Sequence, residues 1–264
     1  MRLRHAGAPF RALHDAFVGS PPDLTGLARE DIAPELRARA IAVWGYRVQT
    51  EFRSMQVMSR FVTEVLASGD PVEVAAGAID ALRDELRHTA LCAAVVEALG
   101  GVPELPELLE ERERPEFLAL PMPARALGTA VSRVLVSETL SVGFITDLHA
   151  RCTQPELRAV LAATLADEDT HDAFGVEYVR ASLARFDDDG RTFAKMVVET
   201  TLAPHVTASA RSLSNVSPER RTLAAWPEPE LAHLGLLGPE REALVFEATK
   251  TTVLLPRLRA LGLD

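Results

Sequence analysis

Apolar and polar residues are interspersed in long stretches of the chain that contain almost no proline or glycine. The first stretch covers residues 34–68 and ends at Gly69-Asp70-Pro71, and the second covers residues 71–99 and ends at Gly100-Gly101. Proline is favoured in the first turn of a helix and glycine just after its end. The pattern therefore predicts two long helices joined by a tight turn, with Asp70 as the N-cap of the second.

The second half of the chain repeats this organisation after a long connection. Residues 102–123 contain five prolines, so a continuous helix cannot run through them. Helices are predicted over residues 124–151 and 155–185, separated by Thr153-Gln154-Pro155-Glu156, which has the residues of a capping box. Two helical hairpins joined by a long crossover form a four-helix bundle, so the predicted fold class is all-α.

The two ends of the chain carry weaker patterns. The N-terminal residues are broken by Ser20-Pro21-Pro22-Asp23 and predict an irregular arm with one short helix. Near the C-terminus we expect a helix over residues 191–202 that ends before Pro204, loop-like residues 212–238, and a helix over residues 239–254 that is interrupted at Pro256. The expected parts are an N-terminal arm (1–33), a four-helix bundle (34–186) and a C-terminal helical extension packed on the bundle (187–264).

The composition agrees with the helical prediction and limits the classes of partner that the protein could bind. Apolar residues make up 47% of the 264 residues and aromatic residues 5%, which favours helix over sheet and a sizeable core. A net charge of −10 argues against nucleic acid as the main partner. Two cysteines, Cys92 and Cys152, are too few for a disulfide framework and fit a reducing compartment. Without a signal-type or membrane-spanning apolar stretch, we expect a cytoplasmic protein with no membrane partner.

The candidate chemistry lies in two copies of Glu-x-x-His, Glu85 to His88 and Glu168 to His171. Residues three apart share one face of a helix, so each copy presents a carboxylate beside an imidazole. This pair of groups suits a transition-metal ion. One copy alone is weak support, because the alternative reading, surface glutamates and isolated histidines, accounts for it equally well.

Each copy is preceded by a helix with a glutamate near its middle, Glu51 before the first copy and Glu138 before the second. One Glu from each of two helices and Glu-x-x-His from each of the other two is the ligand set of carboxylate-bridged dimetal bundles. Four carboxylates balance two divalent ions, whereas without metal each buried carboxylate would cost several kcal/mol or take up a proton. Oxygen-rich ligation with one imidazole per ion suits iron or manganese.

Residues beside the motifs are candidates to support the ligands. Asp84 and Asp167 each precede a motif glutamate, and each could accept a hydrogen bond from the opposite histidine and fix its tautomer. Arg87 could in turn pair with an aspartate. The second copy has Thr170 at the matching position, so this part of the prediction is asymmetric. The alternative for each of them is a solvated helix charge.

Trp44, seven residues before Glu51, and Tyr178, seven residues after His171, lie on the faces that carry the ligands. Either could relay electrons, although core packing is the favoured interpretation. Cys92, four residues after His88, is interpreted as a small core residue rather than a reactive thiol.

At these positions the chain resembles the ferritin-like superfamily, in particular its non-haem di-iron oxygenase and oxidase branch, through the Asp-Glu-x-Arg-His string around Glu85. The resemblance covers residues 35–185 and implies a ferritin-like four-helix bundle in which Glu85 and Glu168 bridge two iron ions, with manganese or a mixed Fe/Mn pair as alternatives. It further implies activation of O2, a small organic substrate and an external electron donor such as a ferredoxin or reductase. The metal ligands that it implies are Glu51, Glu85, His88, Glu138, Glu168 and His171.

Two other functions compete with an oxygenase or oxidase. A ferroxidase, peroxidase or iron-storage protein of ferritin or rubrerythrin type would use the same ligands, but the chain has no Cys-x-x-Cys pair, and its long C-terminal extension is unusual for a cage. A metal-free helical interaction module would leave the buried acids without compensation. A homodimer is an assembly that the sequence allows.

Overall fold

The computed structural model describes residues 1–5, 7–107, 113–214 and 226–264. The described residues are helical apart from turns, connections and an isolated bridge between Arg2 and Glu104, which confirms the predicted all-α class. The helices are α1 (Ala8–Val18), α2 (Thr25–Arg29), α3 (Pro34–Ala67), α4 (Val72–Ala98), α5 (Pro115–Leu118), α6 (Met122–Thr129), the π-helical η1 (Ala130–Ser137), α7 (Glu138–Arg151), α8 (Pro155–Leu183), α9 (Asp188–Ser214), α11 (Glu228–His233), α12 (Pro239–Thr249), the π-helical η2 (Lys250–Leu254) and α13 (Leu255–Leu261).

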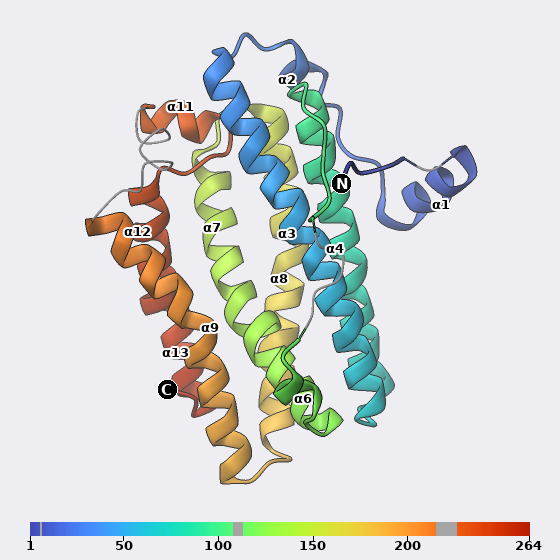
Figure 1. Cartoon of the computed structure of the whole chain (residues 1–264), viewed down its shortest axis with the longest axis vertical. Coiled ribbons are helices and arrows are strands. Elements are labelled where there is room, and N and C mark those ends of the chain that lie inside the picture. The colour runs from blue at the N-terminus through green and yellow to red at the C-terminus, as the bar shows by residue number, and fades with distance from the viewer. Residues whose placement is uncertain (6, 108–112, 215–225) are drawn as a thin grey trace.

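Long helices lie alongside one another in the middle of the molecule (Figure 1). A tight turn joins α3 to α4, and Gly69 adopts a φ of +72° there, a conformation that residues with a side chain rarely adopt. A second short turn joins α7 to α8, and the proline-rich connection leads from α4 to α6. The helix predicted over residues 124–151 is the continuous run of α6, η1 and α7, with a π-helical segment in its middle. Helix α4 packs against α8, and α3 packs against α6.

The caps of α4 and α8 differ from the prediction. Asp70 does not cap α4, because its carboxylate accepts a hydrogen bond from the Tyr178 hydroxyl at 2.9 Å and pairs with Arg185. A charged partner that follows the C-terminal end of α8 outcompetes the local backbone N–H groups. In α8 the cap is Gln154, whose side chain accepts a hydrogen bond from the Leu157 backbone N–H at 2.7 Å.

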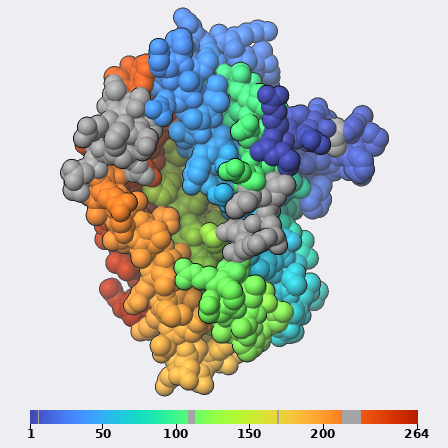
Figure 2. Space-filling model, viewed as in Figure 1, coloured from blue at the N-terminus to red at the C-terminus, as the bar shows by residue number. Residues whose placement is uncertain are grey.

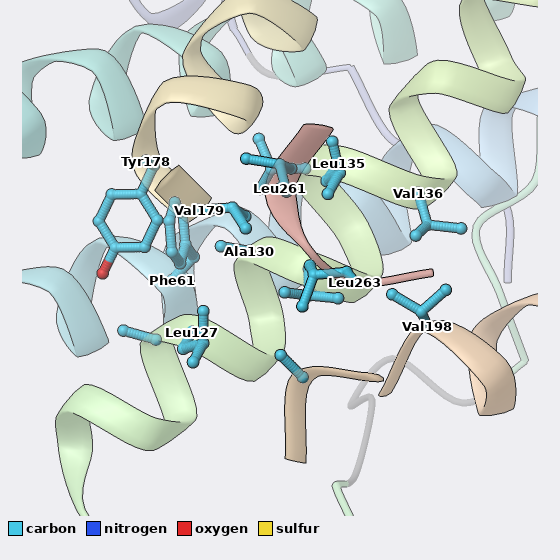
Figure 3. Packing of buried hydrophobic residues seen from close by; sticks show 14 of the residues in the cluster. Phe61, Leu127, Ala130, Leu135, Val136, Tyr178, Val179, Val198, Leu261 and Leu263 are labelled. Carbon is cyan, nitrogen blue, oxygen red and sulfur yellow. The ribbon is translucent and has the colours of Figure 1, made fainter. Parts of the chain in front are cut away.

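Two apolar clusters fill the interior at different heights along the long helices. One cluster includes Phe61, Leu127 and Val179 and is shown in Figure 3. The other cluster includes Trp44 and Leu157 near the opposite ends of the same helices. Between the two apolar clusters, the long helices bury glutamate, aspartate and histidine side chains instead. We call this zone the polar layer; it comprises Glu51, Asp84, Glu85, His88, Glu138, Asp167, Glu168 and His171.

The C-terminal helices pack on the outside of η1 and α7 (Figure 1). Helix α9 continues through Pro204, so the prediction that this proline ends the helix was wrong. Pro204 and Thr200, whose carbonyl loses its helical partner, are both exposed, so water can satisfy that carbonyl. The helix also runs on through Pro256, and the widened π-helical turns of η2 end two residues before the proline.

At the N-terminus the arm contains two short helices, α1 and α2, rather than the single one expected, and α1 projects from the body of the molecule (Figure 1). The division into arm, bundle and extension at residues 33/34 and 186/187 stays a prediction. Among the described helices, none combines the length and the apolar character needed to cross a membrane.

Candidate metal centre

The six residues predicted as metal ligands come together in the polar layer. They are contributed by α3, α4, α8 and the first residue of α7. The imidazole of His88 is fully buried, and the side chains of Glu85, Glu168 and His171 are at most 4% exposed. Glu51 is the more open member, with a side chain that is 20% exposed.

The ligand atoms form two adjoining groups. Glu51, Glu85 and His88 can each direct one atom into the first group, and Glu85, Glu138 and His171 into the second, with all atoms of a group within 4.8 Å of one another. Glu168 lies between the two histidines: its Oε1 is 3.5 Å from Nδ1 of His88 and its Oε2 is 3.4 Å from Nδ1 of His171. Glu85 belongs to both groups and Glu168 faces both histidines, which is the arrangement that bridging carboxylates require.

The other ring nitrogen of each histidine is held across the layer. Nε2 of His88 lies 3.1 Å from Oδ2 of Asp167, and Nε2 of His171 lies 3.1 Å from Oδ2 of Asp84. Because a carboxylate accepts hydrogen bonds, Nε2 carries the proton in a neutral ring and Nδ1 keeps a lone pair that points into the layer. The cross-layer hydrogen bonds predicted for both aspartates are present, and their role toward a metal stays a prediction.

Both aspartates are backed by arginines from α4. Arg87 donates to both oxygens of Asp167 at 2.8 and 2.7 Å, which is the pairing that the sequence suggested for it. Arg83 donates to Oδ1 of Asp84 from Nε at 3.1 Å and Nη2 at 2.9 Å. Sequence reasoning missed Arg83, although it lies one helical turn before Arg87 and its position could have indicated this. Each histidine is thus held by an aspartate that is itself held by an arginine, so the surroundings of His88 and His171 are more alike than the sequence suggested.

Some buried polar atoms of the layer have no hydrogen-bond partner. They are Oε2 of Glu85, Oε2 of Glu168, and Nδ1 of His88 and of His171. Each is a strong acceptor when its residue carries no extra proton, and leaving such atoms buried without a partner costs about 1–3 kcal/mol each. Glu85, His88 and His171 contribute atoms to the two groups, and Glu168 lies between the histidines, so divalent cations would satisfy all four atoms. The four carboxylates and two imidazoles around them fit iron or manganese.

Electrostatics without a bound cation favour protonation of the layer. Burial, followed by repulsion from neighbouring acids, raises the pKa of Glu85 and of Glu138 well above the usual range. Burial also raises the pKa of Glu51. For Glu168 burial acts in the same direction, but the close approach of His171 and Glu138 and the charge of the two histidines outweigh it and lower the pKa. Cations bound here would lower these raised pKa values again, because they stabilise the ionised carboxylates.

The helix that carries Glu138 is brought close to α8 by a glycine. A Cβ atom at Gly175 would lie 2.3 Å from the backbone oxygen of Val134, so only glycine permits this approach of α8 to η1. The π-helical segment η1 ends immediately before Glu138, and such segments occur frequently at functional sites. Sequence reasoning could locate the glycine but not the π-helical geometry.

The C-terminal extension also reaches the edge of the polar layer. Arg257 of α13 donates to the Thr139 hydroxyl at 2.9 Å and pairs with Asp172, and Thr139 donates to Asp172 at 3.1 Å. Thr139 follows Glu138 and Asp172 follows His171 in the chain, so this contact fixes the backbone beside two candidate ligands. No local pattern predicts this contact, because the partners are far apart along the chain.

The three residues considered for electron transfer or pocket roles are core residues. Trp44 is 1% exposed, and its Nε1–H donates to the Leu234 carbonyl at 3.1 Å. Tyr178 is buried edge-on against Phe61, and burial raises its pKa to about 12. Cys92 is buried, and burial raises the pKa of its thiol. These contacts agree with the favoured packing interpretation.

Comparison with protein-family models, with curated proteins and with solved structures yields no significant match for this chain. What can be inferred about function therefore depends on the residues of the polar layer and on the cavity beside it.

Proposed function

We propose that this chain is a dimetal-carboxylate protein with a ferritin-like four-helix bundle. Glu51, Glu85 and His88 would hold one ion, and Glu85, Glu138 and His171 the other. Glu168 would contact both. More specifically, we propose a di-iron oxygenase or oxidase that uses O2 to oxidise a small organic molecule.

The observation that carries this proposal is the set of buried atoms without partners. His88 and His171 each have Nε2 engaged by an aspartate and Nδ1 directed at Glu168 without a hydrogen bond. A metal-free interaction module gains nothing from this arrangement and pays the full desolvation cost of the acceptors. A pair of divalent cations satisfies all of them and neutralises the four glutamates.

The protein residues would contribute orientation and charge. Asp84 and Asp167 keep Nε2 of each histidine protonated and make Nδ1 the better donor to a cation. The apolar clusters on either side of the layer limit access of water from the two ends of the molecule. Two ferrous ions in this set would supply electrons and open coordination positions for the reduction of O2.

In an oxygenase reaction one atom of O2 enters a C–H bond of the substrate and the other leaves as water. Two further electrons and two protons complete the balance, and the electrons would come from a donor such as a reduced ferredoxin. A cavity of about 310 Å³ reaches Glu85 and Glu138, which favours an organic substrate over an iron-storage role.

Metal analysis tests the first part of the proposal. Protein produced with added iron should contain about two iron or manganese ions per chain. Glu85→Gln should lower both occupancies, because Glu85 belongs to both groups. Glu97→Gln is a matched control on the same helix, with a side chain that is 45% exposed. Absence of metal, or zinc alone, would contradict the proposal.

Reaction with O2 tests the second part. Rapid mixing of the anaerobic ferrous protein with O2 should give a transient absorption band and consume O2 in proportion to the two ions. Oxidation and retention of many iron ions per chain would instead indicate storage. A ferrous protein that is stable in air would exclude the oxygenase and oxidase reading.

A further inference from the structure

The cavity that reaches the polar layer lies between α3 and the η1–α7 segment. Its volume of about 310 Å³ is at the lower end of the range for pockets that hold small molecules. Glu85 and Glu138 form part of its wall. In Figure 2 the surface is hollowed between α3, in blue, and α9, in orange. A larger cavity of about 600 Å³ beneath α1 is lined by none of the six candidate ligands.

The residues around this cavity change character with depth. Arg53 and Arg133 are exposed and therefore lie toward its mouth. Val57 and Met58 are 2% and 3% exposed, and Glu85 is 2% exposed, so these residues form its inner part. The cavity thus has a cationic entrance, a mixed wall whose buried part includes two apolar side chains, and an end at two candidate metal ligands.

We propose that the substrate is a small organic anion whose carboxylate is bound by Arg53 and Arg133 at the entrance of this cavity. The apolar part of the molecule lies against Val57 and Met58, and the carbon to be oxidised faces Glu85 and Glu138. The inference rests on the proposed dimetal function and adds the class of substrate to it.

Charge explains why such a substrate binds more tightly to the metal-loaded protein. Any ionised glutamate at the inner end repels an anion, whereas two divalent cations offset the charge of the four glutamates and leave the arginines to set the local potential. Arginine presents paired N–H donors that match the two oxygens of a carboxylate. Among the residues that the structure describes, no carboxylate forms an ion pair with Arg53.

Binding experiments with the metal-loaded protein test this proposal without measuring turnover. Benzoate, hexanoate and succinate serve as anionic probes, and benzamide and hexanamide as neutral counterparts, in anaerobic calorimetry with the Fe(II) form. At least one carboxylate should bind more tightly than its amide, and the same carboxylate should bind less well to the metal-free protein. The Arg53→Gln/Arg133→Gln double variant should weaken it about tenfold, because both contacts are partly screened by water.

Arg180→Gln is the matched control, because Arg180 is an exposed arginine on α8 that pairs with Glu177 outside the cavity. It should leave probe binding unchanged. Metal content and melting temperature of each variant establish that the site is intact.

Three results would overturn the inference. A carboxylate that bound the double variant as tightly as the wild type would be held by the metal alone. Equal affinity for carboxylates and amides in a protein with two ions would exclude an anionic substrate while leaving the dimetal function standing. A chain that takes up no metal would remove both proposals.

Discussion

Replacement of Asp84 with asparagine removes one charge from the support of His171 and nearly preserves the shape of the side chain. Oδ2 of Asp84 lies 3.1 Å from Nε2 of His171, and Arg83 donates to the other oxygen. The amide keeps one oxygen that can accept the Nε2–H bond, but it no longer stabilises positive charge on the ring. Nδ1 of His171 should therefore become a weaker ligand.

The expected loss is a factor of about 10–100 in the affinity for one ion, or about 1.4–2.7 kcal/mol. The side chains of Asp84 and His171 are only 4% and 3% exposed, so water screens their interaction little. His171 belongs with Glu85 and Glu138, whereas His88 belongs with the other group. The change should thus weaken one of two binding steps, and Asp167→Asn should weaken the other.

The assay is an anaerobic titration of the metal-free protein with Mn(II) or Fe(II) in competition with a chelator, fitted to two affinities. Asp80→Asn is the matched control: Asp80 is on the same helix, pairs with Arg83 at 2.8 Å and has a side chain that is 50% exposed. It should leave both affinities unchanged within about a factor of two, because exposed ion pairs contribute little.

Two results would refute this reasoning. Asp84→Asn could bind both ions as tightly as the wild type, which would make Asp84 an ordinary buried helix charge. Alternatively, Asp80→Asn could weaken binding as much as Asp84→Asn, which would trace the effect to the overall charge of α4. Melting temperatures of the metal-free variants, measured in parallel, separate loss of affinity from loss of folding.

Other predictions concern stability. Glu64→Leu should lower the free energy of unfolding by about 2–4 kcal/mol in urea titrations, because it removes the carboxylate that pairs with Arg125, whose side chain is only 14% exposed, and one of the two that pair with Arg60; a loss below about 1 kcal/mol would contradict this. Gly175→Ala should lower the free energy of unfolding by about 1–3 kcal/mol and reduce metal occupancy, since the added Cβ would meet the Val134 carbonyl. Gly45→Ala should raise the free energy of unfolding by about 0.4–1 kcal/mol, because the added Cβ would have no atom within 4 Å. The metal-free protein should lose stability as pH rises from about 5 to 9. Burial lowers the pKa of His171, but the carboxylates of Asp84 and Glu168 outweigh it and raise the pKa from 6.5 to about 9. The pKa values of three glutamates are also raised, so the folded state binds more protons than the unfolded state across this window. The metal-loaded protein should not show this decline. If chemical denaturation of the metal-free protein gave the same free energy of unfolding from about pH 5 to pH 9, the prediction would be contradicted.

The long helices and the convergence of their motifs could be predicted from the sequence because they follow local rules. Spacing of three residues places Glu85 beside His88 on one helix face, and it does the same for Glu168 and His171. Proline and glycine placed the turns between hairpin helices close to where the structure has them. Such features depend on residues within one or two turns of each other, so a single sequence is sufficient to find them.

Features that depend on distant partners could not be predicted in this way. Asp70 was expected to cap α4, but Tyr178 and Arg185, more than a hundred residues away, bind its carboxylate instead. Pro204 was expected to end a helix, but its exposed position tolerates the lost hydrogen bond. Arg257 reaches Asp172 only because the C-terminal helices fold back onto the bundle. In each case tertiary contacts override the local preference.

The strongest physical argument for a cation in the polar layer is that a buried glutamate elsewhere in the chain has arginine partners, whereas, among the residues that the structure describes, the buried glutamates of the layer have none. Glu64, fully buried lower on α3, is neutralised by Arg60 and Arg125 and accepts a hydrogen bond from a threonine hydroxyl at 2.7 Å. Glu85 and Glu168 are buried almost as completely, yet in the described part of the chain no arginine or lysine pairs with either. The arginines near the layer bind the outer aspartates instead and leave the inner oxygens facing one another. A chain that needed only stability would place a basic side chain there, as it does at Glu64; the unpaired inner oxygens are what the proposed pair of cations would satisfy.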